Sequence, residues 1–175
     1  MKFTPTPLEG AFIIDLEPKG DERGFFARVF CQEEFTQHGL EPHIFQANCS
    51  LSKEKGTLRG LHYQLPPFEE TKLVRCLSGA IYDVILDLRK NSSTFGKSYG
   101  EILTPENRRM LYVPRGFAHG FLTLEPNSEI LYMVSASYSQ IHERGIRWND
   151  PNFTIAWPIV PRVISERDQS HKDFE

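Results

Sequence analysis

The chain has 175 residues, a formal net charge of −3 and a hydrophobic content of 39%, so its length fits one domain with a real core. The acidic balance does not favour nucleic acid as a partner, and the apolar runs are interrupted by charges too often to span a membrane. The segment Met1–Pro7 lacks the apolar stretch of a secretory signal, and the 3 cysteines are odd in number and widely spaced. We therefore expect a single cytoplasmic domain over residues 1–175, without a disulfide framework.

Aromatic residues make up 12% of the chain, and 12 Gly and 12 Pro are spread along it, which favours an all-β fold of short strands and turns. In chain order the predicted strands are 25–30, 44–50, 57–63, 72–77, 80–88, 100–103, 110–113, 120–124 and 129–137. Short helices are predicted at 31–39 and 104–109, the second with Thr104 as N-cap and Pro105 at its first position. The pattern predicts a sandwich or jelly-roll barrel, onto which the segment 163–168 is able to fold back.

Two histidine segments carry candidate chemistry. Arg59 and His62 differ in strand parity, so a bulge at Gly60, or the end of the strand, would be needed for both to reach one pocket. His119 follows the turn Pro114–Gly116. Each histidine alone is most simply a structural residue. Together the two segments resemble the paired motifs of the cupin superfamily, which are small β-barrels with a site in the barrel mouth.

A metal site is the first alternative that these segments raise. Metal-binding cupins carry His-x-His followed by Glu, whereas this chain has Gln64 at the second position and Glu69 near the place of the Glu. Because His62, Glu69 and His119 would leave one imidazole missing, we expect no metal. A metal-dependent cupin enzyme with Fe, Mn or Zn on these three residues remains the alternative.

Two further groups of residues suggest a ligand site. Tyr132 and Tyr138 are separated by an even number of residues, so they share a face if one strand runs through both. Arg23, Arg59 and Lys72 would bind a diphosphate if the barrel mouth gathered them, because Arg side chains match phosphate oxygens.

Six segments stand out along almost the whole chain: Asp21–Phe26, Arg59–Gln64, Lys72–Arg75, Pro114–Phe121, His142–Pro151 and Ser165–Asp168. In this order they resemble the motifs of the dTDP-4-dehydrorhamnose 3,5-epimerase family. The resemblance implies a cupin-type jelly-roll barrel and a homodimer without metal or cofactor. It also implies an activity, the inversion of carbons that flank the keto group of a nucleotide-linked 6-deoxysugar.

The resemblance also implies roles for single residues. His62 would be the base and Asp168 its partner, Lys72 would serve the enolate, and Tyr132 would donate a proton. The nucleotide-diphosphate sugar would contact Arg23, Gln46, Asn48, Arg59, His119, Glu143 and Arg167. These residue types suit the reaction, because a proton beside a ketone is acidic only if the enolate is stabilised, and inversion needs an acid on the opposite face. Tyr138 would pack against the ligand.

The chain departs from the family pattern at three positions. Arg28 replaces the usual Glu, and Ala47 and Cys49 interrupt the usual Gln-Asp-Asn-His. We expect these positions near the nucleoside and sugar, so the nucleobase, the sugar and the set of inverted carbons stay open. A sugar-nucleotide ketoisomerase on the same fold is the closest alternative, and a catalytically silent binding module is another.

Overall fold

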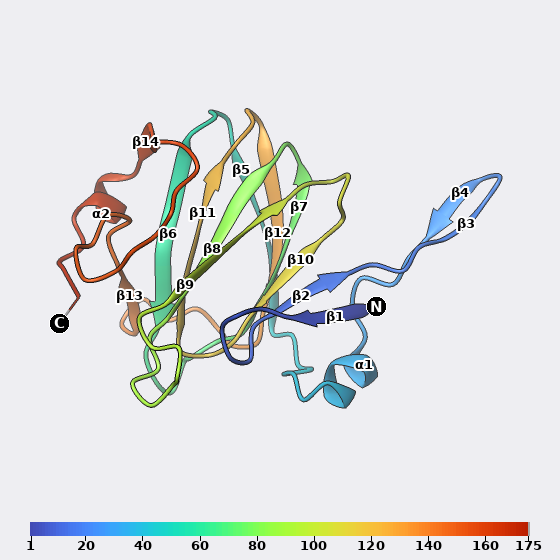
Figure 1. Ribbon diagram of the computed structural model, residues 1–175, viewed down its shortest axis with the longest axis horizontal. Helices are drawn as coiled ribbons and strands as arrows, with labels where there is room; N and C mark the ends of the chain where they lie inside the picture. The colour runs from blue at the N-terminus through green and yellow to red at the C-terminus, as the bar shows by residue number, and fades with distance from the viewer. Residues whose placement is uncertain (175) are drawn as a thin grey trace.

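The computed structural model describes residues 1–174, which form two large, mainly antiparallel sheets that face each other (Figure 1). The first sheet has the order β1 (Lys2–Pro5), β2 (Phe12–Asp15), β10 (Met110–Val113), β7 (Lys72–Ser78), β12 (Ser128–Val134), β5 (Gln46–Ser52). The second has the order β13 (Glu143–Gly145), β6 (Thr57–Gln64), β11 (Phe117–Thr123), β8 (Ile81–Asp87), β9 (Ser98–Leu103). The predicted all-β jelly roll is confirmed.

Side-chain alternation along the strands builds the core between the sheets. On β8, Ile81 and Ile85 face the interior, where they pack in one cluster with residues of β7 and β12 such as Val74 and Ile130. The other face of β8 belongs to a separate cluster outside the second sheet, to which Leu86 contributes. This division follows from the two-residue period of side chains along a β-strand.

The outer faces of both sheets are covered by segments that are mostly irregular. Helix α1 (Gln32–Gln37) places Phe35 against the first sheet, and the C-terminal region packs Phe153 and Trp157 against the second. Strand β14 (Val163–Ile164) then pairs in parallel with β6, and helix α2 (Glu166–Gln169) follows directly. The prediction that 163–168 folds back is thus confirmed. No helix among residues 1–174 is long and apolar enough to cross a membrane.

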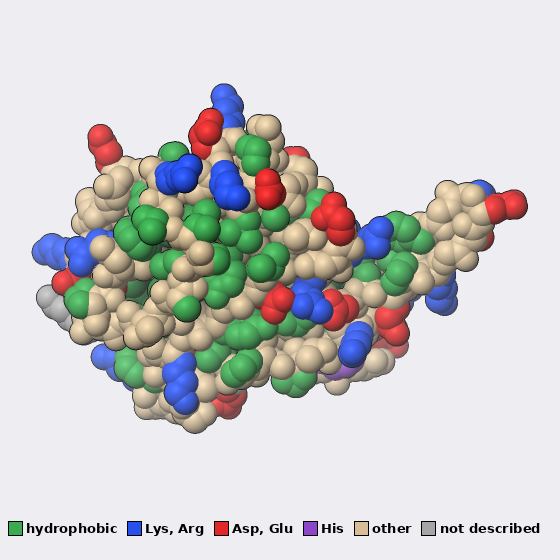
Figure 2. All heavy atoms as spheres, turned by 45° about the horizontal axis from the view of Figure 1, so that its top comes forward, with side chains coloured by type: hydrophobic (Ala, Val, Ile, Leu, Met, Phe, Trp, Pro, Cys, Tyr) green, Lys and Arg blue, Asp and Glu red, His purple; other side chains and the backbone are tan. Residues whose placement is uncertain are grey.

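The hairpin of β3 (Lys19–Asp21) and β4 (Gly24–Phe26) extends away from the body of the molecule (Figures 1 and 2). Its two strands pair only with each other, and the side chains of Phe25 and Phe26 are 52% and 72% exposed. The predicted strand 25–30 is therefore wrong beyond Phe26, because no strand of the body lies beside it.

The predicted helix 104–109 is also wrong. The Asn107 side chain accepts hydrogen bonds from the backbone amides of Thr104 and Arg109, at 3.1 and 3.0 Å. Arg108 has a φ of +52°, in the left-handed region that ends a helical turn. Local side-chain bonds thus close a turn in place of a helix, as Asn often does.

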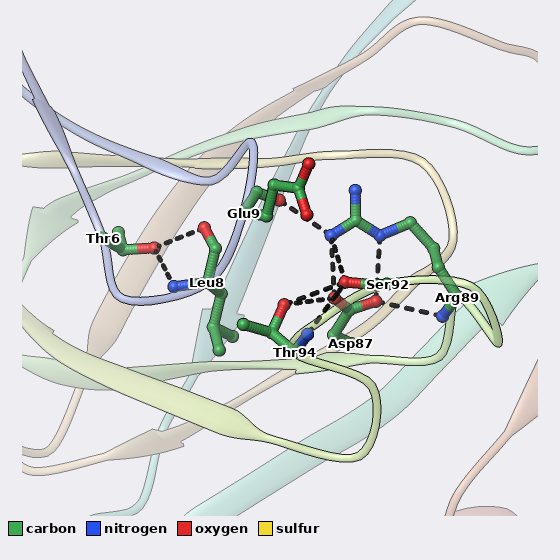
Figure 3. A network of polar contacts seen from close by, with 7 residues as sticks. All are labelled: Thr6, Leu8, Glu9, Asp87, Arg89, Ser92 and Thr94. Atoms are coloured by element: carbon green, nitrogen blue, oxygen red, sulfur yellow. Dashed lines mark hydrogen bonds and ion pairs between the residues drawn. The ribbon is translucent and has the colours of Figure 1, made fainter.

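Figure 3 shows a buried carboxylate that ties two loops together. Asp87 accepts hydrogen bonds from Arg89 Nη2 at 2.7 Å and from the hydroxyls of Ser92 and Thr94, each at 2.6 Å. Arg89 Nη2 also donates to the backbone oxygen of Glu9 at 2.8 Å. Burial alone would raise the pKa of Asp87, but these hydrogen bonds lower it well below its ordinary range. The network fixes the loop after β8 against the loop between β1 and β2.

Candidate active site

Two adjoining pockets of about 530 and 260 Å³ open between the sheets, and His62, Lys72 and Tyr132 line both. The larger also has the predicted residues Arg59, His119, Arg167 and Asp168 on its walls. The smaller has Gln46, Asn48, Tyr138 and Glu143. Three of the four predicted catalytic residues therefore stand where the pockets meet.

His62 and Asp168 form a hydrogen-bonded pair although they lie 106 residues apart in the chain. The distance from His62 Nε2 to Asp168 Oδ1 is 2.7 Å, and Asp168 Oδ2 accepts from the backbone amide of Gly60 at 3.1 Å. Burial raises the pKa of Asp168, but the hydrogen bonds from His62 and Gly60 outweigh it and lower the pKa. An ionised carboxylate at Nε2 leaves Nδ1 as the ring nitrogen that can take a proton from a ligand.

A β-bulge beside Gly60 brings Arg59 and His62 to the same pocket. His62 is the register partner of His119, but Arg59 is the partner of Phe121, so the register between β6 and β11 shifts by one residue. Gly60 has a φ of +111°, and a Cβ there would lie 2.6 Å from Gly120 Cα. Only glycine can adopt this φ and allow the two backbones to approach so closely. The bulge predicted at Gly60 is therefore confirmed.

A second imidazole–carboxylate pair lies beside the first. His119 Nε2 is 2.8 Å from Asp83 Oδ1, and Asp83 is completely buried. Asp83 was not among the residues predicted for the site. Its signal was present, because Asp83 shares the inward strand face with Ile81 and Ile85, and a carboxylate at a core position needs a partner.

Lys72 and Tyr132 point into the pockets from the first sheet. Lys72 is 8% exposed, and its Nζ lies 3.3 Å from Glu70 Oε1 and 3.4 Å from the backbone oxygen of His62. Glu70, which the sequence analysis did not single out, thus holds the ammonium group beside the base. Burial, helped by the charge of Glu70, raises the pKa of Tyr132, so its phenol is protonated at neutral pH.

Two arginines stand on the wall of the larger pocket. Arg59 is held by Ser52 Oγ and the backbone oxygen of Leu51, each at 3.1 Å, while Arg167 pairs with Glu143. Both arginines and Ser165 line this pocket. This wall can bind a phosphate group, because it combines fixed positive charge with several donors.

Tyr138 reaches the smaller pocket by a route that differs from the prediction. Strand β12 ends at Val134, so Tyr132 and Tyr138 do not share one strand face. Instead the Tyr138 hydroxyl donates to Glu143 Oε2 at 2.6 Å. Burial raises the pKa of Glu143, but hydrogen bonds from Tyr138 and Arg167 lower it overall.

The structure does not bring Arg23 and Arg28 into either pocket of this chain. Arg23 lies at the end of the projecting hairpin, has an 84% exposed side chain and pairs with Asp21. Arg28 pairs with Glu34 of helix α1 at 3.0 Å. The predicted cluster of Arg23 with Arg59 and Lys72 is therefore not found within one chain.

Two of the departures from the family pattern also lie away from the pockets. Ala47 and Cys49 are exposed on β5, whereas Gln46 and Asn48 between them line the smaller pocket. Strand alternation turns the altered side chains outward. The expectation that these changes lie near the nucleoside and sugar is therefore not met by Ala47 and Cys49 in this chain.

The ligand set of the metal-cupin alternative is not gathered. Glu69 lines neither pocket, and His119 is bonded to Asp83. Over residues 1–174, the only group of three or more His, Cys, Asp or Glu side chains with metal-site spacing is His62, Asp168 and His171. His171 was not among the residues predicted for the site.

An imidazole–carboxylate pair, a buried ammonium group and a protonated phenol thus meet between the sheets of a cupin-type barrel. This set can remove and return protons beside a carbonyl group, so fold and site define an isomerase that works by proton transfer. The family model described as dTDP-4-dehydrorhamnose 3,5-epimerase matches residues 5–175, and the chain belongs to that family.

Individual relatives agree with this assignment over nearly the full chain. The dTDP-4-dehydrorhamnose 3,5-epimerase of Shigella flexneri is 46% identical over 175 residues, which cover 99% of this chain and 96% of the relative. The crystal structure of the epimerase of the same name from Elizabethkingia anophelis is 41% identical and superimposes with a TM-score of 0.96, covering 99% of this chain and 96% of that one. That from Bacillus anthracis, with TDP and PPi bound, is 41% identical and has a TM-score of 0.94, covering 99% of each chain.

Proposed function

We propose that the protein inverts C3 and C5 of a dTDP-linked 4-keto-6-deoxyhexose, the two carbons beside the keto group. The observation that carries this proposal is the convergence of the His62–Asp168 pair, Lys72 and Tyr132 at the junction of the two pockets. Membership of the epimerase family supports the choice of a dTDP-sugar, and the basic wall of the larger pocket suits its diphosphate.

In the proposed chemistry, a base removes a proton from a carbon beside the ketone, and an acid then gives a different proton to the same carbon. Nδ1 of His62 takes the proton from the carbon beside the ketone, and Asp168 stabilises the imidazolium ion that forms. The electron pair left on carbon moves into the enolate, whose oxygen is stabilised by the Lys72 ammonium group. The Tyr132 phenol then protonates the same carbon from the opposite face, which inverts it. Solvent water takes the proton from the imidazolium ion and returns one to the phenolate, so both groups can act at the second carbon.

The diphosphate contacts Arg59 and Arg167 in this proposal, and His119 completes the wall beside the base. Gln46, Asn48, Tyr138 and Glu143 contact the ligand from the smaller pocket. All three cysteines are free thiols, which supports a site of action in the reducing cytoplasm.

Measurement of solvent exchange tests the function directly. Purified protein is incubated in D₂O with dTDP-4-keto-6-deoxyglucose, and NMR follows deuterium entry and configuration at C3 and C5. We expect exchange and inversion at both carbons. Movement of the carbonyl group would instead identify a ketoisomerase, binding without exchange would identify a silent binding module, and inversion at one carbon would restrict the activity to that carbon.

A homodimer accounts for the position of Arg23. The hairpin extends from the body (Figure 1) with Arg23 at its end and with Phe26 72% exposed, while the guanidinium group of Arg108 covers the ring of Phe25, so this arm is able to reach a second copy of the chain. In the proposed dimer, Arg23 and Arg28 contact the ligand of the partner subunit. This arrangement reconciles the roles implied by the resemblance with the absence of both residues from the pockets of their own chain.

Mixing two inactive variants tests this arrangement. If Arg23 acts across the subunit boundary, a mixed dimer of Arg23→Ala and His62→Asn has one site with both wild-type residues. Random exchange of subunits should then restore up to about a quarter of the wild-type activity, because half of the sites in half of the dimers are intact. A mixture that stays inactive after verified exchange would place Arg23 and His62 in the same subunit's site, and a monomer in light scattering would reject the dimer.

A further inference from the structure

We propose that His62, Asp168 and His171 form an inhibitory site for a divalent transition metal ion such as Zn²⁺. Binding of the ion needs only the three side chains, whereas its effect on catalysis rests on the proposed function. The ion is not a cofactor here, since its binding would occupy the base that the reaction needs.

The three donor atoms are already close together. His62 Nε2 and Asp168 Oδ1 are 2.7 Å apart, His171 Nε2 and Asp168 Oδ1 are 3.8 Å apart, and all three atoms lie within 4.8 Å of one another. Zinc bonds of about 2.0–2.2 Å place neighbouring ligand atoms of a tetrahedron roughly 3.3–3.6 Å apart. Side-chain movements on the order of 1 Å would therefore complete the three-ligand arrangement, with a fourth position open to water.

His171 is the least explained member of this group. Its Nε2 is buried and has no hydrogen-bond partner anywhere in the described chain. The ring lies directly over Gly145, where an added Cβ would come within 2.0 Å of that nitrogen. An unpaired buried imidazole nitrogen is costly, and a metal ion would satisfy it together with the neighbouring carboxylate.

The local charges favour a cation. Asp168 supplies a carboxylate charge. The neutral ring of His171 has a nitrogen lone pair that can bind a metal ion. The nearby Arg167 is paired with Glu143, so its positive charge is largely balanced.

Binding of the ion would disable the base because it changes the tautomer of the His62 ring. A metal on Nε2 of a neutral His62 leaves the single ring proton on Nδ1, the nitrogen that faces the ligand in the proposed mechanism. The ring then has no lone pair with which to take a proton from the sugar. The substrate can still occupy the pockets, but the first step stops.

Direct binding tests the site without any reference to activity. Zn²⁺ is titrated calorimetrically into metal-free protein, and Co²⁺ is used in parallel because its absorption spectrum reports coordination. We expect one ion per chain, and at least about a tenfold weaker binding in His171→Asn, in line with the loss of a ligand. His43→Asn is the matched control, because His43 is exposed and pairs with Glu41 on the surface. Binding that is absent from the wild type, or equal in the wild type and His171→Asn, would overturn the site.

Activity assays then test inhibition. With free Zn²⁺ buffered at a fixed concentration, deuterium exchange should fall in the wild type and in His43→Asn but persist in His171→Asn. Chelator should restore it. Chelation of the substrate diphosphate affects all three proteins equally, so a difference between them reports the site. Equal inhibition of all three would reject the inhibitory role. If no dTDP-sugar exchanges deuterium in the absence of zinc, the proposed function is rejected. The calorimetry would still test the metal site by itself.

Discussion

His62 and His119 face each other as register partners on β6 and β11, and each imidazole is bonded to a different carboxylate. Asp168, the partner of His62, comes from helix α2, while Asp83, the partner of His119, comes from the buried face of β8. Both rings are thus fixed by one nitrogen. The proposed base differs from its neighbour in that its carboxylate is carried by the tail and not by the barrel.

Replacement of His62 should stop proton removal. We expect His62→Asn to lower deuterium exchange at both carbons by a factor on the order of 10² to 10⁴, the range for loss of a general base. Asp168→Ala should cost less, because it removes the group that orients the base and not the base itself. Exchange is measured by NMR, with dTDP titration as the control for binding. Exchange by His62→Asn within a few-fold of wild type would reject this residue as the base.

Removal of the Tyr132 hydroxyl should separate exchange from inversion. Tyr132→Phe keeps the ring, so folding and binding should survive. Deuterium should still enter the substrate, while inverted product falls by a factor on the order of 10² or more, because the second face lacks its acid. NMR of one reaction mixture measures both quantities. If inversion continues at nearly the wild-type rate, water or Tyr138 supplies the proton.

Chelation should leave the enzyme active. Gln64 stands where a metal cupin has its second histidine, and its side chain instead donates to Phe68 O and Ser137 O at 3.0 and 3.1 Å. We therefore expect full exchange activity after dialysis against a chelator, with elemental analysis confirming that metal has been removed. Activity that is lost on dialysis and returns with Fe, Mn or Zn would contradict this prediction.

Loss of the Asp87 carboxylate should destabilise the barrel. We expect Asp87→Asn to lower the free energy of unfolding by about 3 kcal/mol, because it breaks the ion pair between the buried Asp87 and Arg89. This value is at the low end of the range for buried pairs because the Arg89 side chain is partly exposed. Denaturant unfolding measures the change. Asp173→Asn, in an exposed pair with Arg147, is the control and should cost about 1 kcal/mol or less. Equal effects of the two substitutions would show that the network in Figure 3 contributes no more to the free energy of unfolding than an exposed ion pair does.

The contribution of Asp87 should also depend on pH. Because its pKa is lower in the folded than in the unfolded protein, the stabilisation is fully present above the unfolded value of about 4. It is lost as the pH falls below that value. The stability difference between wild type and Asp87→Asn should therefore be constant from pH 5 to 8, roughly, and shrink under more acid conditions.

The sequence predicted those parts of the fold that depend on strand period and turn chemistry. The buried alternation of β8 and the bulge beside Gly60 both follow from local residue patterns. The prediction of a helix at 104–109 failed because the Asn107 side chain competes with helical hydrogen bonds. The end of β12 at Val134 coincides with the change from apolar residues to Ser135 and its small neighbours, a signal that the predicted strand 129–137 did not take into account.

Within the site, the family resemblance pointed to His62 and Tyr132 but not to Asp83, Glu70 and His171, which lie around them. Asp83 could have been found as a carboxylate on an apolar strand face. Glu70 and His171 could not, because their positions depend on how a loop and the tail pack in three dimensions. Arg23 lies far from the pockets because the hairpin β3–β4 extends away from the body. The local sequence pattern does not predict the direction of this hairpin.

The return of the tail to β6 makes the proposed base conditional on a segment that lies 106 residues further along the chain. During synthesis, a barrel without residues 165–168 would have an unpartnered His62 and would lack part of the wall of the larger pocket. The same coupling operates in the finished protein, where β14 is only two residues long and α2 four. Each local opening of this short segment would disconnect the carboxylate, so amide hydrogen exchange in the tail should report the fraction of molecules whose base is unassembled at any moment.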